Sequence, residues 1–370
     1  MLYREAGDFS TTYPQDSQTF PIRFDRYRYY VVLAIAVFVM PFLMTDYLVN
    51  SIFLPFLIYA IAAIGLNILT GYCGQVSLGT GGFMAVGAYS CYKFMTGVDI
   101  WWGGELLFRL PEFNIFFSVI MGGVMTALVG VLFGLPSLRI KGFYLAVATL
   151  AAQFFLVWLF NRVAWFYNYS ASGQINAPER DLFGILITGP STQPWATYLF
   201  CLFFTIVCAI IARNLTRGAT GRKWMAIRDM DIAAEIIGVN PLKAKLTAFA
   251  VSSFYIGVAG ALFFAVYLGA VEVGEAFGIT KSFLVLFMVI IGGLGSIFGS
   301  FAGAAFLVIL PVILKIVGAD WLDWPDDLVA HLQLVIVGAL IMAFLIFEPH
   351  GLAQLWRLAK EKLRLWPFPH

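Results

Sequence analysis

Residues 51–82 read SIFLPFLIYAIAAIGLNILTGYCGQVSLGTGG, and this stretch decides what kind of fold the chain can adopt. Its first part, 51–70, is almost continuously apolar and has the length that an α-helix needs to cross the hydrocarbon core of a bilayer. The remainder, 71–82, contains five glycines and cannot form an ordinary span. Irregular backbone at membrane depth survives only where protein buries it or where it lines a watery cavity. The stretch therefore predicts a membrane helix that runs into a broken segment.

The whole chain is as apolar in composition as a membrane protein. Of its 370 residues, 61% are hydrophobic and only 12% are charged, and the mean hydropathy is +0.86. Soluble domains carry about 25% charged residues because their surfaces face water. Since one span takes roughly 20 residues, the chain has room for about ten. We therefore predict an all-α polytopic membrane protein, without a separate soluble domain and without a removable signal peptide in residues 1–30.

The apolar runs mark the expected helices. They are residues 29–49, 51–70, 79–96, 114–135, 143–166, 195–213, 245–270, 281–293, 296–316 and 331–348. The run 281–293 is too short to span comfortably, and it leads into the sequence Gly292-Gly293-Leu294-Gly295. We therefore expect about ten transmembrane helices, some of them broken or re-entrant.

The distribution of charge predicts the orientation. If the chain starts in the cytoplasm and crosses ten times, most of its 23 basic residues fall on the inside. The outside connection 317–330 then holds four aspartates and no Lys or Arg. This is the positive-inside pattern of membrane proteins. We expect cytoplasmic segments at 1–29 and 349–370 around a transmembrane domain at 30–348, with both termini in the cytoplasm.

Small residues recur at every fourth position in one of the late apolar runs. Gly295, Gly299 and Gly303 would share one face of a helix there, and such a face lets a neighbouring backbone approach closely. The stripe packs either against another helix of this chain or against a second membrane subunit. Both interpretations remain open from the sequence.

The longest inside connection, residues 214–243, carries a further helical signal. Trp224, Ile227 and Ala234 recur at helical spacing, and Gly238 supplies a stop signal. The sequence predicts a short amphipathic helix between two spans. It either lies flat at the lipid interface, with its basic residues toward headgroups, or serves as a docking helix for a soluble partner.

Four motifs resemble those of the LivM-type permease subunits of branched-chain amino-acid ABC importers. In chain order they occupy residues 71–89, 139–150, 221–241 and 282–296. In the third motif Ala233-Ala234-Glu235 and Gly238 stand in the places of the Glu-Ala-Ala…Gly pattern of ABC importer permeases, although the acid follows the alanines here. The order and spacing of the motifs match this family, and the resemblance covers residues 50–352.

The resemblance implies a permease that moves branched-chain amino acids or related small solutes across a bacterial inner membrane. It implies as partners a second, LivH-like permease subunit, two ATP-binding subunits and a periplasmic solute-binding protein, besides membrane lipid and without nucleic acid. ATP and Mg would be bound by the partner subunits, since this chain has no phosphate-binding loop and no catalytic residue of its own. Coupling to the ATPase would fall on Arg222, Trp224, Ile227, Arg228, Ala234, Glu235 and Gly238.

A small set of polar residues lies in or beside the apolar runs. They are Asn67, Gln75, Ser77, Thr80, Thr149 and Gln153. Burying an amide in hydrocarbon without a partner costs several kcal/mol, so each of these side chains should face protein or water. They either make hydrogen bonds between helices or line the translocation path.

Other functions remain as alternatives. Residues 170–178 depart from the Thr-Asn-Gly-Ile stretch of many relatives, and family members also move urea, amides or aromatic acids. An ion-coupled secondary transporter is less favoured, because the runs hold essentially no ionisable residue at mid-membrane. An intramembrane enzyme is disfavoured, because the three histidines are scattered and the four cysteines show no metal-ligand spacing.

Overall fold

The computed structural model describes residues 11–12, 23–102, 105–137, 143–182, 184–189, 191–321, 325–348 and 351–365. The helices follow the chain as α2 (Arg23–Ala34), η1 (Ile35–Val39), α3 (Met40–Leu43), α4 (Asp46–Leu48), η2 (Val49–Phe53), α5 (Leu54–Asn67), η3 (Ile68–Tyr72), α6 (Thr80–Thr96), α7 (Ile115–Ser137), α8 (Phe143–Arg162), η4 (Ala164–Tyr167), α9 (Pro194–Arg217), α10 (Ala219–Asp229), α11 (Asp231–Ile236), α12 (Pro241–Leu262), η5 (Phe263–Leu268), α13 (Val273–Ala276), α14 (Ile279–Gly292), α15 (Ile297–Lys315), η6 (Ile316–Trp321), α16 (Asp326–Phe347) and α17 (Gly351–Leu365).

The apolar helices confirm the predicted class, an all-α polytopic membrane protein. Each of the ten apolar runs contains a helix. In the described part of the chain, seven helical segments are long and apolar enough to cross a bilayer. They are Asp46–Tyr72, Ile115–Leu135, Tyr144–Arg162, Pro194–Arg217, Pro241–Leu268, Val273–Gly292 and Ile297–Gly318. Shorter apolar stretches at Tyr29–Leu43 and Val335–Phe344 accompany them. The number of spans expected from length alone, about ten, is therefore not established by the helices.

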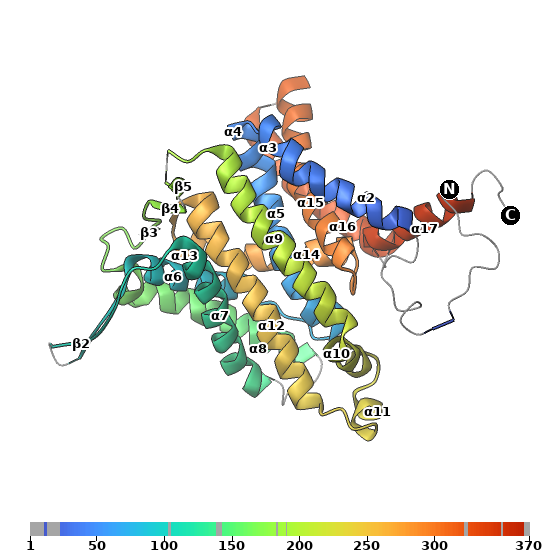
Figure 1. Cartoon of the computed structure of the whole chain (residues 1–370), viewed down its shortest axis with the longest axis horizontal. Coiled ribbons are helices and arrows are strands. Elements are labelled where there is room, and N and C mark those ends of the chain that lie inside the picture. Colours follow the sequence, from blue (N-terminus) through green and yellow to red (C-terminus); the bar gives the residue numbers. More distant parts are fainter. Residues whose placement is uncertain are drawn as a thin grey trace.

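The centre of the bundle is built on α12, which packs along α5, α6 and α7 (Figure 1). Glycines permit the close approach of these helices. A methyl group on Gly87 of α6 would overlap the carbonyl of Gly257 in α12, and one on Gly257 would overlap Thr126 of α7. Because only a hydrogen fits at these points, the three backbones cross almost in contact, as small residues allow in membrane helices.

The two ends of the bundle differ in structure (Figure 1). At one end, here called the strand end, three two-stranded antiparallel sheets connect the helices. They pair β1 (Val98–Trp102) with β2 (Glu105–Leu110), β3 (Ile175–Asn176) with β6 (Ala270–Val271), and β4 (Arg180–Leu182) with β5 (Ile185–Thr188). The sequence predicted none of these strands. At the opposite end, here called the hairpin end, α10 and α11 join α9 to α12.

The late helices α14 and α15 are separated by a break at residues 293–296, as the short eighth run predicted. On α15, a methyl group at Gly299 or Gly303 would overlap backbone carbonyls of α14. These two glycines therefore pack α15 against a helix of the same chain. Gly295 was wrongly assigned to their stripe, because it lies in the break, where its φ of +74° is the left-handed conformation that favours glycine.

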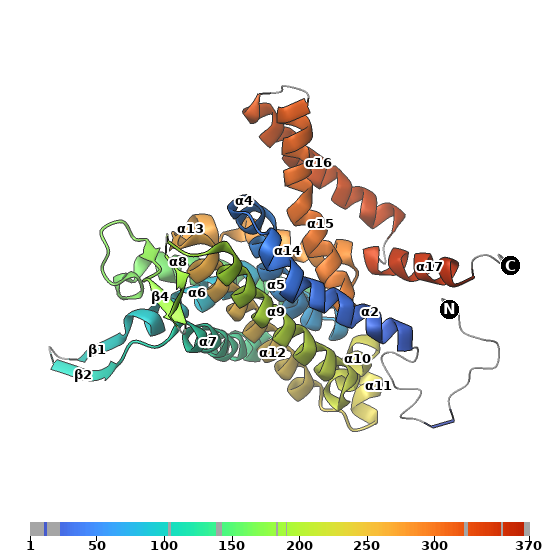
Figure 2. The same ribbon diagram turned by 45° about the horizontal axis from the view of Figure 1, so that its top comes forward.

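The end of the chain leaves this bundle. Figure 2 shows the end of α15 and helix α16 reaching away from the other helices on one side, with α17 returning toward them. At the start of α15, Trp356 of α17 stacks on Phe298, with ring centroids 5.8 Å apart. The predicted tail 349–370 thus contains a helix that packs on α14 and α15. Residues 349–350 and 366–370 lie outside the described ranges.

Candidate functional site

The two glycine-rich breaks of the sequence meet in space. α5 continues into η3, and residues 73–79 then lead in irregular backbone to the start of α6. Gly71, at the end of η3, lies directly against Gly295 in the α14–α15 break. A methyl group on Gly71 would overlap the Gly295 amide nitrogen, so the two backbones touch. This contact brings together segments that are far apart in the sequence.

Asn67 fastens the contact. Its Nδ2 donates to the carbonyl of Ser296 at 2.9 Å and to Oγ of Ser300 at 2.9 Å, and its Oδ1 accepts from the Gly295 amide at 2.8 Å. The side chain is 1% exposed, so these bonds replace hydration entirely. An amide buried at membrane depth requires such partners. Asn67 therefore ties the end of α5 to the break and to the first turn of α15.

Arg228 links the helix pair at the hairpin end to the same place. Its Nη1 donates to the carbonyl of Gly71 at 2.9 Å, and its Nε donates to Asp229 at 3.0 Å. We call Asn67, Gly71, Arg228 and Gly295 the glycine junction. Through it, α10 is joined by one charge-assisted hydrogen bond to the end of a buried span and, through Asn67, to the α14–α15 break.

The predicted amphipathic helix is in fact two short helices, α10 and α11. The chain bends between them at Met230, whose φ of −162° and ψ of 100° are extended. Gly238, with φ +88°, follows α11, and α12 begins at Pro241, so the predicted stop signal is confirmed. We call α10 and α11 together the coupling hairpin. Its bend was missed because helical spacing in the sequence continues across residue 230.

The inner face of the coupling hairpin holds it on the bundle. Trp224, Ile227 and Ala234 are all buried within this chain. The indole Nε1 of Trp224 donates to Oγ1 of Thr247 on α12 at 3.2 Å. These three residues were assigned to coupling from the sequence, and the structure gives them contacts with the spans rather than an outward surface.

The outer face of the coupling hairpin is open and unexpectedly apolar. Met230, Ile232, Ile236 and Ile237 are between 66% and 82% exposed. The predicted residues Arg222, Glu235 and Gly238 are exposed as well. These four exposed apolar side chains were not predicted from the sequence. The signal in the sequence was the three isoleucines near Ala234, namely Ile232, Ile236 and Ile237. One buried face of so short a helix does not need that many apolar residues.

Three of the six predicted path residues, Asn67, Thr149 and Gln153, make side-chain hydrogen bonds between segments. Oγ1 of Thr149 accepts from the Leu78 amide at 2.9 Å. Nε2 of Gln153 donates to the Phe277 carbonyl at 2.8 Å, and its Oε1 accepts from Ser282 and from the Gly82 amide. With Asn67, these side chains hold α5, α6, α8 and the α14–α15 pair together. A role for them in lining the path stays a prediction.

Three path residues lie in the segment after η3 or at the start of α6. Oγ of Ser77 accepts from the Gly79 amide at 3.4 Å. Within the described part of the chain, Oγ1 of Thr80 and Oε1 of Gln75 are buried and have no hydrogen-bond partner. Gln75 also lines a pocket of about 680 Å³ at the hairpin end. Buried polar atoms without partners are rare in proteins, so this place carries a functional signal.

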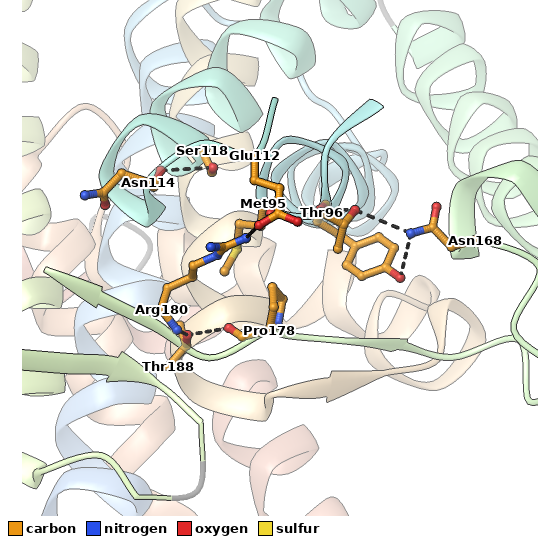
Figure 3. Close-up of polar contacts among 10 residues, drawn as sticks. Met95, Thr96, Glu112, Asn114, Ser118, Asn168, Pro178, Arg180 and Thr188 are labelled. Carbon is orange, nitrogen blue, oxygen red and sulfur yellow. Dashed lines mark hydrogen bonds and ion pairs between the residues drawn. The ribbon is translucent and has the colours of Figure 1, made fainter. Parts of the chain in front are cut away.

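The strand end is fastened by a second set of polar contacts (Figure 3). Arg180 donates through Nη2 to the Met95 carbonyl at 2.6 Å and forms an ion pair with Glu112. Asn168, which has φ +52°, donates to the Tyr92 hydroxyl at 3.1 Å. The connection between α8 and α9 is therefore anchored on the end of α6, and the predicted outward loop 170–178 includes strand β3.

The fold and this junction define the class of the chain: a polytopic helical membrane protein in which broken apolar helices contact a pair of short helices, α10 and α11, that lie outside the candidate spans. The family model described as the permease component of the branched-chain amino acid transport system matches residues 47–345. The chain belongs to this family. The motif at 139–150 that suggested it is described only from Phe143 onward.

Similar proteins carry related descriptions. The high-affinity branched-chain amino acid transport system permease protein LivM of Escherichia coli is 31% identical, over 81% of this chain and 69% of its own length. The protein of the same description in Salmonella typhimurium is 29% identical over the same shares. A probable branched-chain amino acid transport permease protein LivM of Methanocaldococcus jannaschii is 24% identical, over 82% of this chain and 93% of its own. No solved structure matches the chain.

Proposed function

We propose that this chain is a membrane-spanning permease subunit of an ATP-driven importer for branched-chain amino acids or closely related small solutes. Membership of the permease family supports transport as the activity. The observation that carries the coupling is the hydrogen bond from Arg228 of the coupling hairpin to the carbonyl of Gly71. It gives an extramembrane element a direct connection to the broken spans.

The outer face of the coupling hairpin supports docking of an ATP-binding subunit. Besides its four exposed apolar side chains, the coupling hairpin exposes the charged residues Arg222 and Glu235. An exposed apolar patch with a polar rim is typical of a protein interface. The other interpretation, a helix that lies flat on the lipid, would place the same side chains in the headgroup region. The bend at Met230 favours docking, because the two helices form a compact projection.

The glycine junction suggests how movement reaches the path. The buried inner face of the coupling hairpin makes it move with the ends of α9 and α12, to which its helices connect. A displacement of α10 acts through Arg228 on Gly71, and through Asn67 on the α14–α15 break. Such discontinuous helices are the places where transporters change conformation and bind solutes. ATP hydrolysis itself would occur on the separate subunits, which would bind ATP and Mg.

The remaining partners follow from the same proposal. A second, LivH-like permease would complete the path, and a periplasmic solute-binding protein would dock at the strand end. Urea, amides or aromatic acids remain the alternative solutes. The loop between α8 and α9 bears on this choice, because it belongs to the surface that such a binding protein would contact.

Reconstitution tests the function. The chain is co-expressed with its neighbouring transport subunits, purified and placed in vesicles with ATP on the hairpin side. We expect ATP-binding subunits to co-purify, and uptake of labelled leucine, isoleucine or valine to require ATP, binding protein and intact hydrolysis. Uptake that persists without ATP and collapses with an ionophore would instead establish an ion-coupled transporter. Competition by urea, amides and phenylalanine ranks the solutes.

Cysteine labelling tests the orientation. We expect Ser172→Cys, at the strand end, to react only with reagent added outside the cell, and Lys362→Cys, on α17, only with reagent that reaches the cytoplasm. The reason is the excess of basic residues on the hairpin side. The background should be low because the four native cysteines are buried, and burial raises the pKa of Cys73 to about 12. Labelling of both positions from the same side would contradict this topology.

A further inference from the structure

A lysine in the first turn of α14 lies at the depth of the middle of the bundle. Nζ of Lys281 donates to the Tyr59 hydroxyl at 3.1 Å, and Tyr59 is the middle residue of its candidate span. The next residue, Ser282, donates to Oε1 of Gln153 at 3.1 Å, and Gln153 is also the middle residue of its candidate span. α14 therefore begins halfway across the bundle. The sequence placed Lys281 at the edge of an apolar run, but the structure places it at mid-membrane depth.

The cation of Lys281 has weak partners in the described part of the chain. Besides donating to the Tyr59 hydroxyl, Nζ lies 5.3 Å from the ring centroid of Phe263 and 5.8 Å from that of Tyr59. Among the described residues, no carboxylate forms an ion pair with it. An ammonium group has three N–H donors, and one hydroxyl uses one of them. Lys281 therefore keeps both charge and donors for a further anionic group.

The side chain of Lys281 is not sealed inside the bundle. Tyr59 and Phe263 are buried. Lys281 itself is partly exposed, and so is Tyr267, whose ring centroid lies 5.3 Å from that of Phe263. A lysine that faces hydrocarbon at this depth is costly, and such residues face a bundle interior or a water-filled cavity instead. The exposed part of Lys281 therefore faces water or a polar group of the assembled transporter rather than lipid.

The surroundings of Lys281 favour a carboxylate that carries an apolar group. An ammonium and a carboxylate form a charge-assisted hydrogen bond, which is stronger than the contacts with a hydroxyl and aromatic rings. The first turn of a helix also favours negative charge, and half-helix N-termini of transporters point at anionic solute groups. The partly exposed ring of Tyr267 offers apolar surface to a hydrocarbon side chain. Urea or a neutral amide would leave the cation without a counter-charge.

We propose that Lys281 lines the translocation path and pairs with the carboxylate of each solute that passes. The path then favours solutes with a carboxylate, such as branched-chain or aromatic amino acids, over urea and neutral amides. Charged side chains select the charge of the solute in other membrane pathways, and conduction requires binding that is weak enough for release. A single partly exposed lysine meets both requirements. The solute class in this inference rests on the proposed function.

Removal of the charge is the first test. In vesicles with ATP, binding protein and labelled leucine, we expect Lys281→Met to reduce the initial rate of uptake by about tenfold or more. The reason is that the carboxylate then crosses mid-membrane depth without a counter-charge. Lys281→Arg should retain more of the uptake. Lys315→Met is the matched control, because this exposed lysine is the last residue of α15, and it should transport normally. Insertion and ATPase co-purification are checked in each variant.

Restoring the charge after assembly separates this role from folding. The four native cysteines are buried, so a new cysteine at position 281 can be modified selectively. We expect Lys281→Cys to transport slowly, and aminoethyl methanethiosulfonate, which attaches an ammonium group through a disulfide, to raise the rate again. Methyl methanethiosulfonate attaches a neutral group and should not raise it. A cysteine at this position that reacts with neither reagent would lie outside a watery path and would overturn the proposal.

The charge of the solute gives a readout that a purely structural lysine would not move. Tyr267→Cys is the reporter, because Tyr267 contacts the same Phe263 ring as Lys281. In the assembled transporter, with and without ATP, we expect leucine and 4-methylpentanoate to slow modification of this cysteine. 3-Methylbutylamine, which has no carboxylate, should have no effect. Adding Lys281→Met should abolish the protection.

The outcomes distinguish the two proposals. Normal leucine uptake by Lys281→Met, or equal protection of Tyr267→Cys by all three compounds, would overturn the role of Lys281 and leave the importer intact. If Lys281→Met does not assemble, the Tyr267→Cys protein still decides, because it retains the lysine. Absence of ATP-driven uptake by the wild type would instead contradict the proposed function.

Discussion

Gly71→Ala should leave the protein inserted in the membrane but reduce ATP-driven uptake by about tenfold or more. The added methyl group would overlap the Gly295 amide nitrogen and Oδ1 of Asn67. Because these neighbours are backbone and a hydrogen-bonded amide, the two breaks must separate. Overpacking of this kind costs about 1–3 kcal/mol, which is enough to shift a conformational equilibrium by one or two orders of magnitude. Uptake and stimulated ATP hydrolysis are measured together in vesicles.

The control for this variant is Gly338→Ala on α16. Among the described residues, no heavy atom lies within 4 Å of a methyl group placed there, and the backbone is helical. It should transport normally at the same expression level. If Gly71→Ala also transports normally, the contact between the breaks has no part in the transport cycle. Asn67→Leu offers a second approach, because it keeps bulk while removing the three bonds that hold the breaks together.

Ile236→Asp combined with Ile237→Asp should release the ATP-binding subunits while the permease still inserts. Both side chains are at least 75% exposed, so the chain itself loses little burial when they change. A docked partner would lose two apolar contacts and face two desolvated carboxylates, which is costly at the centre of an interface. Co-purification of the ATPase and substrate-stimulated hydrolysis are the measurements.

The control for this double variant is Ile185→Asp at the strand end. It makes the same chemical change at a partly exposed isoleucine far from the hairpin, and the ATPase should remain bound. Gly238→Leu belongs in the same series, since φ +88° is strained for leucine, and it should uncouple hydrolysis from uptake. Wild-type coupling in all of these variants would favour a hairpin that lies at the lipid interface.

Local sequence patterns predicted the helices and the breaks of this molecule. They did not predict which of these segments contact one another. Apolar runs located the helices because length and hydropathy are local properties. The breaks around Gly71 and Gly293 were visible because glycine-rich sequence cannot remain an ordinary span. Their contact was not predictable, because nothing local relates Gly71 to Gly295 across the intervening helices.

Two predictions from the sequence were wrong for the same reason, because both relied on helical spacing alone. Four-residue spacing placed Gly295 on a helix, but spacing alone does not reveal that the helix begins at Ile297. Helical spacing also joined α10 to α11, although the chain bends at Met230. The short strands at the strand end were missed because strands of two to six residues carry too little pattern for recognition.

The hydrogen bonds of Asn67 also set an order for biogenesis. Its partners Ser296 and Ser300 lie 229 and 233 residues further along the chain. At synthesis rates of about 5–20 residues per second, this amide spends roughly ten seconds or more in the nascent protein before its partners exist. During that interval the early spans hold an amide without its native partners, which a membrane chaperone or protease can recognise. A chain cut short before α15 would never acquire those partners, so premature termination should yield a product marked for removal.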